Sequence, residues 1–210
     1  KEGVRIHLEK RIPVAAGMAG GSTDAAAVFK GMNALFALGL STEELQRQAV
    51  KLGADIPYCI LGGTALAEGI GEKLTVLPDA PDCFLLVAKP DISVSTKYVY
   101  ENLNLPSVTK HPDIDGMVEA IKAKDADGVW MRMENVLETV TVKAYPIIEE
   151  LKQEMMDGGA IKSLMSGSGP TVFGVFKDAA KAQEVLQTIV EKDLAKQVFV
   201  TGFIRPTKEV

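Results

Sequence analysis

The sequence predicts an α+β fold in two domains. Strand-like alternation and helical spacing of apolar residues both recur along the chain. Residues 77–82 hold two prolines and two aspartates, a composition that extends neither a helix nor a sheet, and the pattern of elements restarts after them. We therefore expect one domain over residues 1–80 and another over residues 83–210.

The N-terminal residues predict a strand followed by a helix. Val4, Ile6 and Leu8 alternate with charged or polar residues, which is typical of a strand with one buried face, ending near Arg11 before a proline. Apolar residues then recur at helical spacing over residues 22–38, and a glycine follows as the stop signal.

A second helix and a hairpin complete the predicted first domain. Ser41 and Glu44 have the spacing of a capping box, so a helix should begin there with Leu45, Ala49 and Leu52 on its buried face. Glycines then separate two short strand-like runs, which predicts a hairpin with strands at 64–67 and 73–77.

The sequence pattern over residues 83–210 predicts a ferredoxin-like order of elements, which is strand, helices, strand, strand, helix and strand. The extra helices fall in the first crossover. The expected strands are 83–89, 160–165, 171–176 and 197–204, and the expected helices are about 95–101, 112–123, 127–140, 145–156 and 178–192.

Composition narrows the classes of function. The hydrophobic fraction of 47% and charged fraction of 24% are those of a globular protein, and the formal charge of −5 gives no basic surplus for nucleic acid. Apolar runs are far shorter than the roughly 20 residues that a membrane span takes, and no signal peptide is visible. Two cysteines without metal or redox spacing favour a reducing cytoplasm, and two histidines exclude a multi-histidine metal site.

The strongest chemical signal is a loop of small residues between the first strand and the first helix. Residues 14–25 contain three glycines and four alanines, so a ligand can approach the backbone closely. The helix start adds unpaired N–H groups and a positive dipole end, which together favour a bound phosphate. The alternative is a tight strand-to-helix turn with a serine cap.

Common phosphate-loop patterns do not fit this loop. A Walker loop requires a lysine between its last glycine and the following serine or threonine, and here Ser22 follows Gly21 directly. The glycine spacing of dinucleotide-binding loops and the sequence triplets of protein kinases are absent as well. The loop instead resembles that of the galactokinase, homoserine, mevalonate and phosphomevalonate (GHMP) kinase superfamily. Further similarity to this superfamily, and to one branch of it, lies in residues 52–58, 63–72, 90–96 and 164–173.

The resemblance implies a GHMP kinase two-domain fold, with part of a ribosomal-protein-S5-like N-terminal domain and a C-terminal ferredoxin-like βαββαβ domain. The branch implied uses ATP and Mg²⁺ to phosphorylate the 2-hydroxyl of a cytidine diphosphate-linked methylerythritol, a small-molecule partner, in non-mevalonate isoprenoid precursor synthesis. The ATP-binding residues that it implies are Pro13, Val14, Ala15, Ala16, Gly17, Met18, Ala19, Gly20, Gly21, Ser22, Thr23, Gly167, Ser168 and Gly169.

The resemblance also assigns catalytic and substrate residues. Asp55 is implied as the catalytic base facing the substrate hydroxyl, Thr96 and Tyr100 as substrate-binding residues, and Ser22 as a metal ligand. The residues alone leave other roles open, because Asp55 also suits a helix cap, residues 167–169 a plain β-turn and Tyr100 the buried face of a helix.

Two other functions compete with this interpretation. One is a different GHMP kinase, for mevalonate or homoserine, and the other is a non-catalytic nucleotide-binding fragment. The resemblance implies an upstream segment that carries the family's first motif, with its lysine and asparagine, and the tyrosine and histidine that hold cytosine. We therefore expect exposed apolar surface in the first domain, or a partner covering it.

Overall fold

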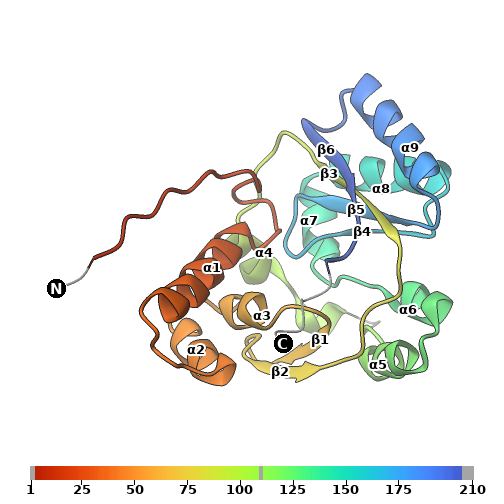
Figure 1. The fold of residues 1–210 in the computed structure, drawn as a ribbon. Helices are drawn as coiled ribbons and strands as arrows, with labels where there is room; N and C mark the ends of the chain where they lie inside the picture. The colour runs from red at the N-terminus through yellow and green to blue at the C-terminus, as the bar shows by residue number, and fades with distance from the viewer. Residues whose placement is uncertain (1–2, 109–110, 205–210) are drawn as a thin grey trace.

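The computed structural model describes residues 3–108 and 111–204, which form a mixed α and β structure (Figure 1). The N-terminal part contains helices α1 (Gly20–Leu35), α2 (Thr42–Ala49) and α3 (Ile56–Leu61) and the hairpin strands β1 (Ala65–Glu68) and β2 (Lys73–Val76). The C-terminal part contains β3 (Phe84–Lys89), α4 (Thr96–Asn102), the short 3₁₀ helix η1 (Leu105–Ser107), α5 (Ile114–Ala123), α6 (Ala126–Arg132), α7 (Glu138–Ala144), α8 (Ile147–Asp157), β4 (Lys162–Met165), β5 (Val172–Phe176), α9 (Ala179–Glu191) and β6 (Gln197–Thr201).

The C-terminal sheet has the ferredoxin-like order that the sequence predicts. Its strands lie in the order β4-β5-β3-β6, and every neighbouring pair is antiparallel. Central strand β3 pairs Leu86 with Gly174 on one side and with Val200 on the other. Since consecutive side chains of a strand point to opposite faces, this register gives the sheet two distinct faces.

One face of the sheet carries the main core. Helices α8 and α9 lie against it, as Figure 1 shows, and bring fully buried Leu151, Met155 and Ile189 against Leu86 and Phe176. The opposite face packs in part against α5 and α6, where Ala120, Ile121, Val129 and Trp130 meet Val175.

The N-terminal part has a smaller core between its helices. Buried Ala26, Leu45, Ala49, Ile56 and Ile60 form it. The predicted capping box of α2 is confirmed, because the Ser41 hydroxyl accepts from the Glu44 N–H at 3.2 Å and the Glu44 carboxylate accepts from the Ser41 N–H at 2.8 Å. The predicted hairpin is confirmed as well.

Two helix predictions near this core are wrong in detail. Leu52 is 73% exposed, because α2 already ends at Ala49 and the helical spacing no longer places residue 52 on the buried face. Helix α1 ends at Leu35 and not at residue 38, since Ala37 takes a left-handed conformation with φ 48°.

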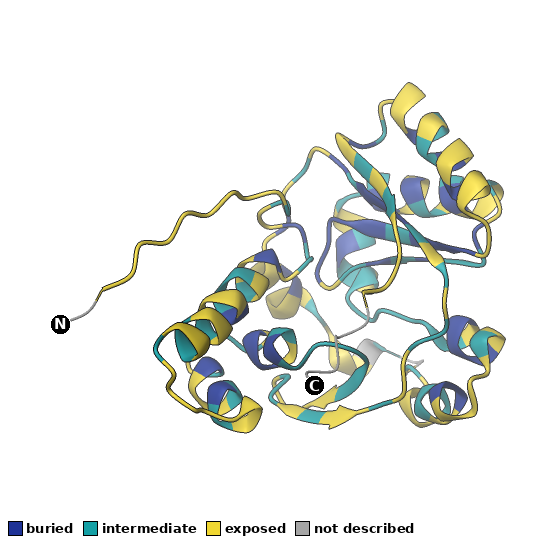
Figure 2. Cartoon of the chain, viewed as in Figure 1, coloured by how far each residue is buried: buried dark blue, intermediate teal, exposed yellow. Residues whose placement is uncertain are grey.

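The predicted first strand is also wrong. Residues 3–11 run extended, but they pair with no strand in the part of the chain that the structure describes (Figure 2). Val4, Ile6 and Leu8 are 45%, 58% and 59% exposed. The alternation of apolar and polar residues therefore indicated a segment that could join a sheet, but a strand also needs the backbone of a partner strand for its hydrogen bonds. Val4, Ile6 and Leu8 thus form exposed apolar surface in the first domain, as expected from the sequence.

A predicted helix over residues 127–140 is two helices. Helix α6 ends at Arg132 and α7 begins at Glu138. Between them the side-chain oxygen of Asn135 accepts from the Leu137 N–H at 3.0 Å, which forms an Asx turn. Asparagine side chains compete with helical hydrogen bonding in this way, so the break is local in origin.

The linker predicted at residues 77–82 lies outside helices and strands, and the division into domains 1–80 and 83–210 stays a prediction. Among the described residues, no helix combines the length and the apolar character needed to cross a membrane.

The packing predicts a sharp contrast between two leucines. Leu151→Ala empties a fully buried position on α8 and should lower the free energy of unfolding by about 2–5 kcal/mol. Leu52→Ala makes the same chemical change at an exposed position and should alter that energy by no more than about 0.5 kcal/mol. Chemical denaturation of both variants measures the difference, and equal losses would contradict the assignment of the core.

Candidate active site

A cavity of about 500 Å³ lies where five segments distant in sequence meet. The stretch that holds Lys10 and residues 13–22, which includes the first turn of α1, contributes to its wall together with the start of α3, helix α4, the start of α7 and the turn before β5. Its lining residues are Lys10, Pro13, Val14, Ala15, Ala16, Gly17, Met18, Ala19, Gly20, Gly21, Ser22, Asp55, Thr96, Tyr100, Leu137, Gly167 and Ser168. Of the predicted site residues, Thr23 and Gly169 do not line it.

The loop before α1 has an unusual backbone. Ala15 and Ala19 have φ values of 52° and 47°, in the left-handed region that residues with side chains seldom occupy, and Gly17 has φ 70°. Such conformations persist only where the surroundings hold them, and they gather at ligand sites. A side chain at Gly17 would also collide with the Ser166 carbonyl oxygen, so close approach between these two segments requires glycine there.

The first turn of α1 lines the cavity with Gly20, Gly21 and Ser22. Ala19 occupies the cap position, and no side chain of the described residues caps the helix. The first turn holds no acidic residue. Ser22 lies inside the helix, so the alternative of a serine cap is wrong. An uncapped helix start that bears only small side chains is suited to an anion, because the N–H groups of its first turn lack partners within the helix and lie at the positive end of its dipole.

The turn before β5 closes the cavity from the C-terminal part. The Ser166 hydroxyl donates to the Gly17 carbonyl at 2.8 Å, and the Thr171 N–H donates to the Ala16 carbonyl at 3.4 Å. The hydroxyls of Thr96 and Ser168 are hydrogen-bonded at 2.9 Å. This turn is therefore more than a connection between strands, since it links the small-residue loop to α4.

Asp55 lies at the cap position of α3 without acting as a cap. Its side chain makes no capping hydrogen bond, and its carboxylate is exposed on the cavity wall. Buried Ile56 and Pro57 directly after it hold the start of α3 in place. The capping role that local sequence suggested is thus not what the side chain does, and the carboxylate remains available to a ligand.

Thr96 and Tyr100 stand one helical turn apart on α4. Tyr100 is 61% exposed, whereas Val99 beside it is fully buried, so the alternative that Tyr100 belongs to a core is wrong. An exposed aromatic ring at a cavity is free to stack on a planar ligand group.

Sequence reasoning missed Lys10 and Leu137 in this wall. The ammonium of Lys10 is 2.5 Å from the Asp24 carboxylate, and the two side chains are 26% and 29% exposed. The sequence contained one indication that Lys10 is unusual. In an extended segment Lys10 lies on the same face as Val4, Ile6 and Leu8, where another apolar residue would be expected.

The described residues hold two free cysteines and no cluster of three metal-ligating side chains. No group of three histidine, cysteine, aspartate or glutamate side chains gathers in residues 3–108 and 111–204. Cys59 and Cys83 are free thiols. Burial, with a smaller contribution from Asp82, raises the pKa of Cys83 to about 11, so this thiol stays protonated at neutral pH.

Comparisons with known proteins agree on one family. Residues 1–63 match the GHMP kinases N terminal domain and residues 117–195 match the GHMP kinases C terminal domain. A 4-diphosphocytidyl-2-C-methyl-D-erythritol kinase of Lachnospira eligens is 54% identical over 97% of this chain and 71% of its own length. The enzyme of the same name from Lachnoclostridium phytofermentans is 55% identical over 96% of this chain and 69% of its own length.

Solved structures give the same result. A crystal structure of 4-(cytidine 5'-diphospho)-2C-methyl-D-erythritol kinase matches with a TM-score of 0.78 and 29% identity, over 94% of this chain and 70% of that one. Homoserine kinase from Cytophaga hutchinsonii matches with a TM-score of 0.74 at 19% identity, over 92% of this chain and 67% of that one, which shows a shared fold. On these findings, the chain belongs to the 4-diphosphocytidyl-2-C-methyl-D-erythritol kinase family of the GHMP kinases.

Proposed function

We propose that this chain transfers the terminal phosphoryl group of ATP to the 2-hydroxyl of 4-diphosphocytidyl-2-C-methyl-D-erythritol. One observation carries the proposal beyond family membership. A single cavity brings the uncapped start of α1, the free carboxylate of Asp55 and the exposed ring of Tyr100 together. These are a phosphate site, a group to orient a hydroxyl and a surface for a planar base. Free thiols at Cys59 and Cys83 suit the reducing cytoplasm as its location.

The phosphates of ATP lie over the small-residue loop and the first turn of α1. Backbone N–H groups of Gly20, Gly21 and Ser22 donate to the phosphate oxygens, and the dipole of α1 stabilises their charge. Ser22 would offer its hydroxyl oxygen to Mg²⁺, which usually takes only one or two protein ligands together with nucleotide phosphates. When bound, Mg²⁺ neutralises charge on the transferred group.

Asp55 orients the attacking hydroxyl and receives its proton. Phosphoryl transfer needs little covalent help from the protein, so alignment and charge stabilisation account for most of the catalysis. One carboxylate held at the start of α3, with no capping hydrogen bond to break, meets this need.

Tyr100 and Thr96 select the substrate. The ring of Tyr100 stacks on the cytosine, an interaction worth about 1–3 kcal/mol per base in other proteins. Thr96 lies beside it on α4, and its hydroxyl is already bonded to Ser168, so the substrate side of the cavity is tied to the nucleotide side.

The phosphate site predicts a strong effect of bulk at Gly21. A Cβ atom added there meets no protein atom within 4 Å, so Gly21→Val fills the cavity without disturbing the fold. We expect Mg-ATP affinity to fall by roughly tenfold or more, since one lost phosphate hydrogen bond of about 1.4 kcal/mol already gives that factor. Isothermal titration calorimetry measures the affinity.

Gly31→Val is the matched control for Gly21→Val. Gly31 lies later in the same helix, also has no atom within 4 Å of an added Cβ, and does not line the cavity. We expect it to bind Mg-ATP normally. Equal affinities of the two variants would remove the first turn of α1 from the proposed site.

Removing the charge of Asp55 should abolish most of the turnover. Asp55→Asn keeps the size of the side chain, and general-base positioning is typically worth about 10²–10⁴-fold in rate. The free energy of unfolding should not change, because the native carboxylate makes no capping bond. Steady-state kinetics measure kcat.

Asp125→Asn makes the same change at a true helix cap. Asp125 accepts from the Gly128 N–H at 3.0 Å at the start of α6 and does not line the cavity. Its kcat should match that of the unmodified protein. A normal kcat in Asp55→Asn would leave that carboxylate without a catalytic role.

The proposal also predicts the choice of acceptor. The kcat/KM for the cytidine diphosphate-linked substrate should exceed that for mevalonate and for homoserine by orders of magnitude, since neither of these carries a base to stack on Tyr100. A coupled ADP-release assay with the three acceptors measures this. Preference for mevalonate or homoserine would assign the chain to another GHMP activity, and ATP binding without transfer to any of them would favour a non-catalytic role.

A further inference from the structure

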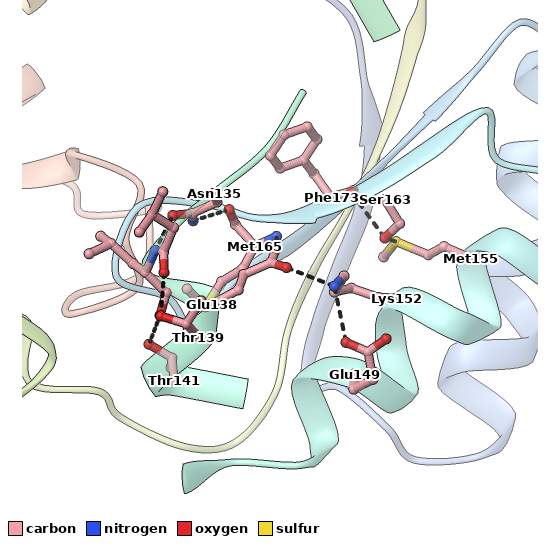
Figure 3. Close-up of polar contacts among 12 residues, drawn as sticks. Asn135, Glu138, Thr139, Thr141, Glu149, Lys152, Met155, Ser163, Met165 and Phe173 are labelled. Atoms are coloured by element: carbon pink, nitrogen blue, oxygen red, sulfur yellow. Dashed lines mark hydrogen bonds and ion pairs between the residues drawn. The ribbon is translucent and has the colours of Figure 1, made fainter. Parts of the chain in front are cut away.

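The turn at residues 166–170 is held from two sides. From the N-terminal part it receives the contact between Ser166 and Gly17. From the C-terminal part it receives side chains of the segment between α6 and α8, which Figure 3 shows reaching toward the end of β4. We call three of these side chains, Asn135, Glu138 and Thr141, the brace.

Asn135 uses its whole carboxamide in this contact. Its Nδ2 donates to the carbonyl oxygens of Met165 and Gly167, each at 2.8 Å, and its Oδ1 accepts from the Leu137 N–H at 3.0 Å. Both amide hydrogens therefore point at the backbone that enters the turn. An isosteric carboxylate offers no hydrogen for either bond.

Glu138 holds the residue at which β4 ends. One carboxylate oxygen accepts from the Met165 N–H at 2.7 Å, and the other accepts from the Lys152 ammonium at 2.8 Å. Lys152 also contacts Glu149 at 3.0 Å. Burial lowers the pKa of Lys152, but the bonds to Glu138 and Glu149 outweigh it and raise the pKa overall, so the ammonium stays charged.

Thr141 completes the brace from inside α7. It is fully buried, and its hydroxyl contacts the carbonyl oxygens of Leu137 at 3.2 Å and Ser168 at 3.3 Å. The three side chains thus reach the backbone of Met165, Gly167 and Ser168, while Leu137 between them lines the cavity directly. Asn135 and Glu138 do not line the cavity themselves, so their effect on a ligand passes through the turn.

We propose that Asn135, supported by Glu138 and Thr141, is a positioning residue that sets the Ser166–Ser168 backbone against the Gly17 loop and so shapes the nucleotide side of the active site. This inference rests on the proposed function of that cavity. The break between α6 and α7 belongs to the same arrangement, because the Asx turn that ends the helical run also aims the Nδ2 of Asn135 at the turn.

Asn135→Asp tests the inference with the smallest change in shape. The substituted carboxylate still accepts from Leu137 N–H, but it places an oxygen against the two carbonyls that Nδ2 now contacts. We expect the Kd for Mg-ATP to rise by roughly tenfold or more, because the loss of one well-placed hydrogen bond to a charged phosphate already weakens binding about tenfold. Amide hydrogen exchange over residues 165–171 should speed up, while exchange over β6 should not change.

Ile189→Val is the control for a merely structural role. Ile189 is fully buried on α9 in the main core and does not line the cavity, so its loss of a methylene lowers the melting temperature without reaching the turn. We expect its Kd for Mg-ATP and its exchange over residues 165–171 to match those of the unmodified chain. Affinity and exchange are measured without the cytidyl substrate, so failure of the proposed phosphorylation does not affect the comparison.

Thr141→Val is the second variant if Asn135→Asp fails to fold. It keeps the buried volume on α7 and removes only the hydroxyl that faces Ser168. A weaker Mg-ATP complex with faster exchange at the turn supports the inference. If the folded variant keeps its Mg-ATP affinity and its exchange rates at the turn, the inference is overturned. It is also overturned if Ile189→Val weakens Mg-ATP binding as much as the variants of the brace do.

Discussion

The arrangement of the site depends on one contact between the two parts of the chain. The Ser166 hydroxyl donates to the Gly17 carbonyl, and glycine at position 17 leaves just enough room for the Ser166 backbone. This contact places a loop from the first twenty residues against a turn from the last fifty. The cavity lies between them, so its shape depends on how closely these two backbones approach each other.

The cavity obtains much of its polarity from backbone groups. An uncapped helix start offers N–H groups at fixed positions, and small residues keep the approach to them open. Preorganised dipoles of this kind stabilise phosphate charge without reorganising during the reaction. Charged side chains are few along the wall, and Lys10 is neutralised in part by Asp24. The free carboxylate of Asp55 is therefore prominent in the site.

Stability and positioning come from different places in the C-terminal part. The core between the sheet and α8 and α9 is apolar and buried, and it makes the larger contribution to folding. The brace is polar, and it reaches the surface at Glu138, whose side chain is 16% exposed and whose partner Lys152 is 17% exposed. Hydrogen bonds have preferred directions, whereas apolar contacts do not, so polar side chains are better suited to orient a turn.

The sequence alone determined the elements whose signals are local. The capping box of Ser41 and Glu44, the hairpin and the ferredoxin-like order of the second part follow from short-range patterns, and so does the small-residue loop before α1. Tertiary structure decided the rest. Alternation at residues 4–8 did not reveal whether a partner strand exists, and the carboxylate of Asp55 looked like a cap until its neighbours were placed. Asn135 meets Met165 and Gly167 from about thirty residues away, and such contacts leave no periodicity in a single sequence because they depend on how the whole chain packs.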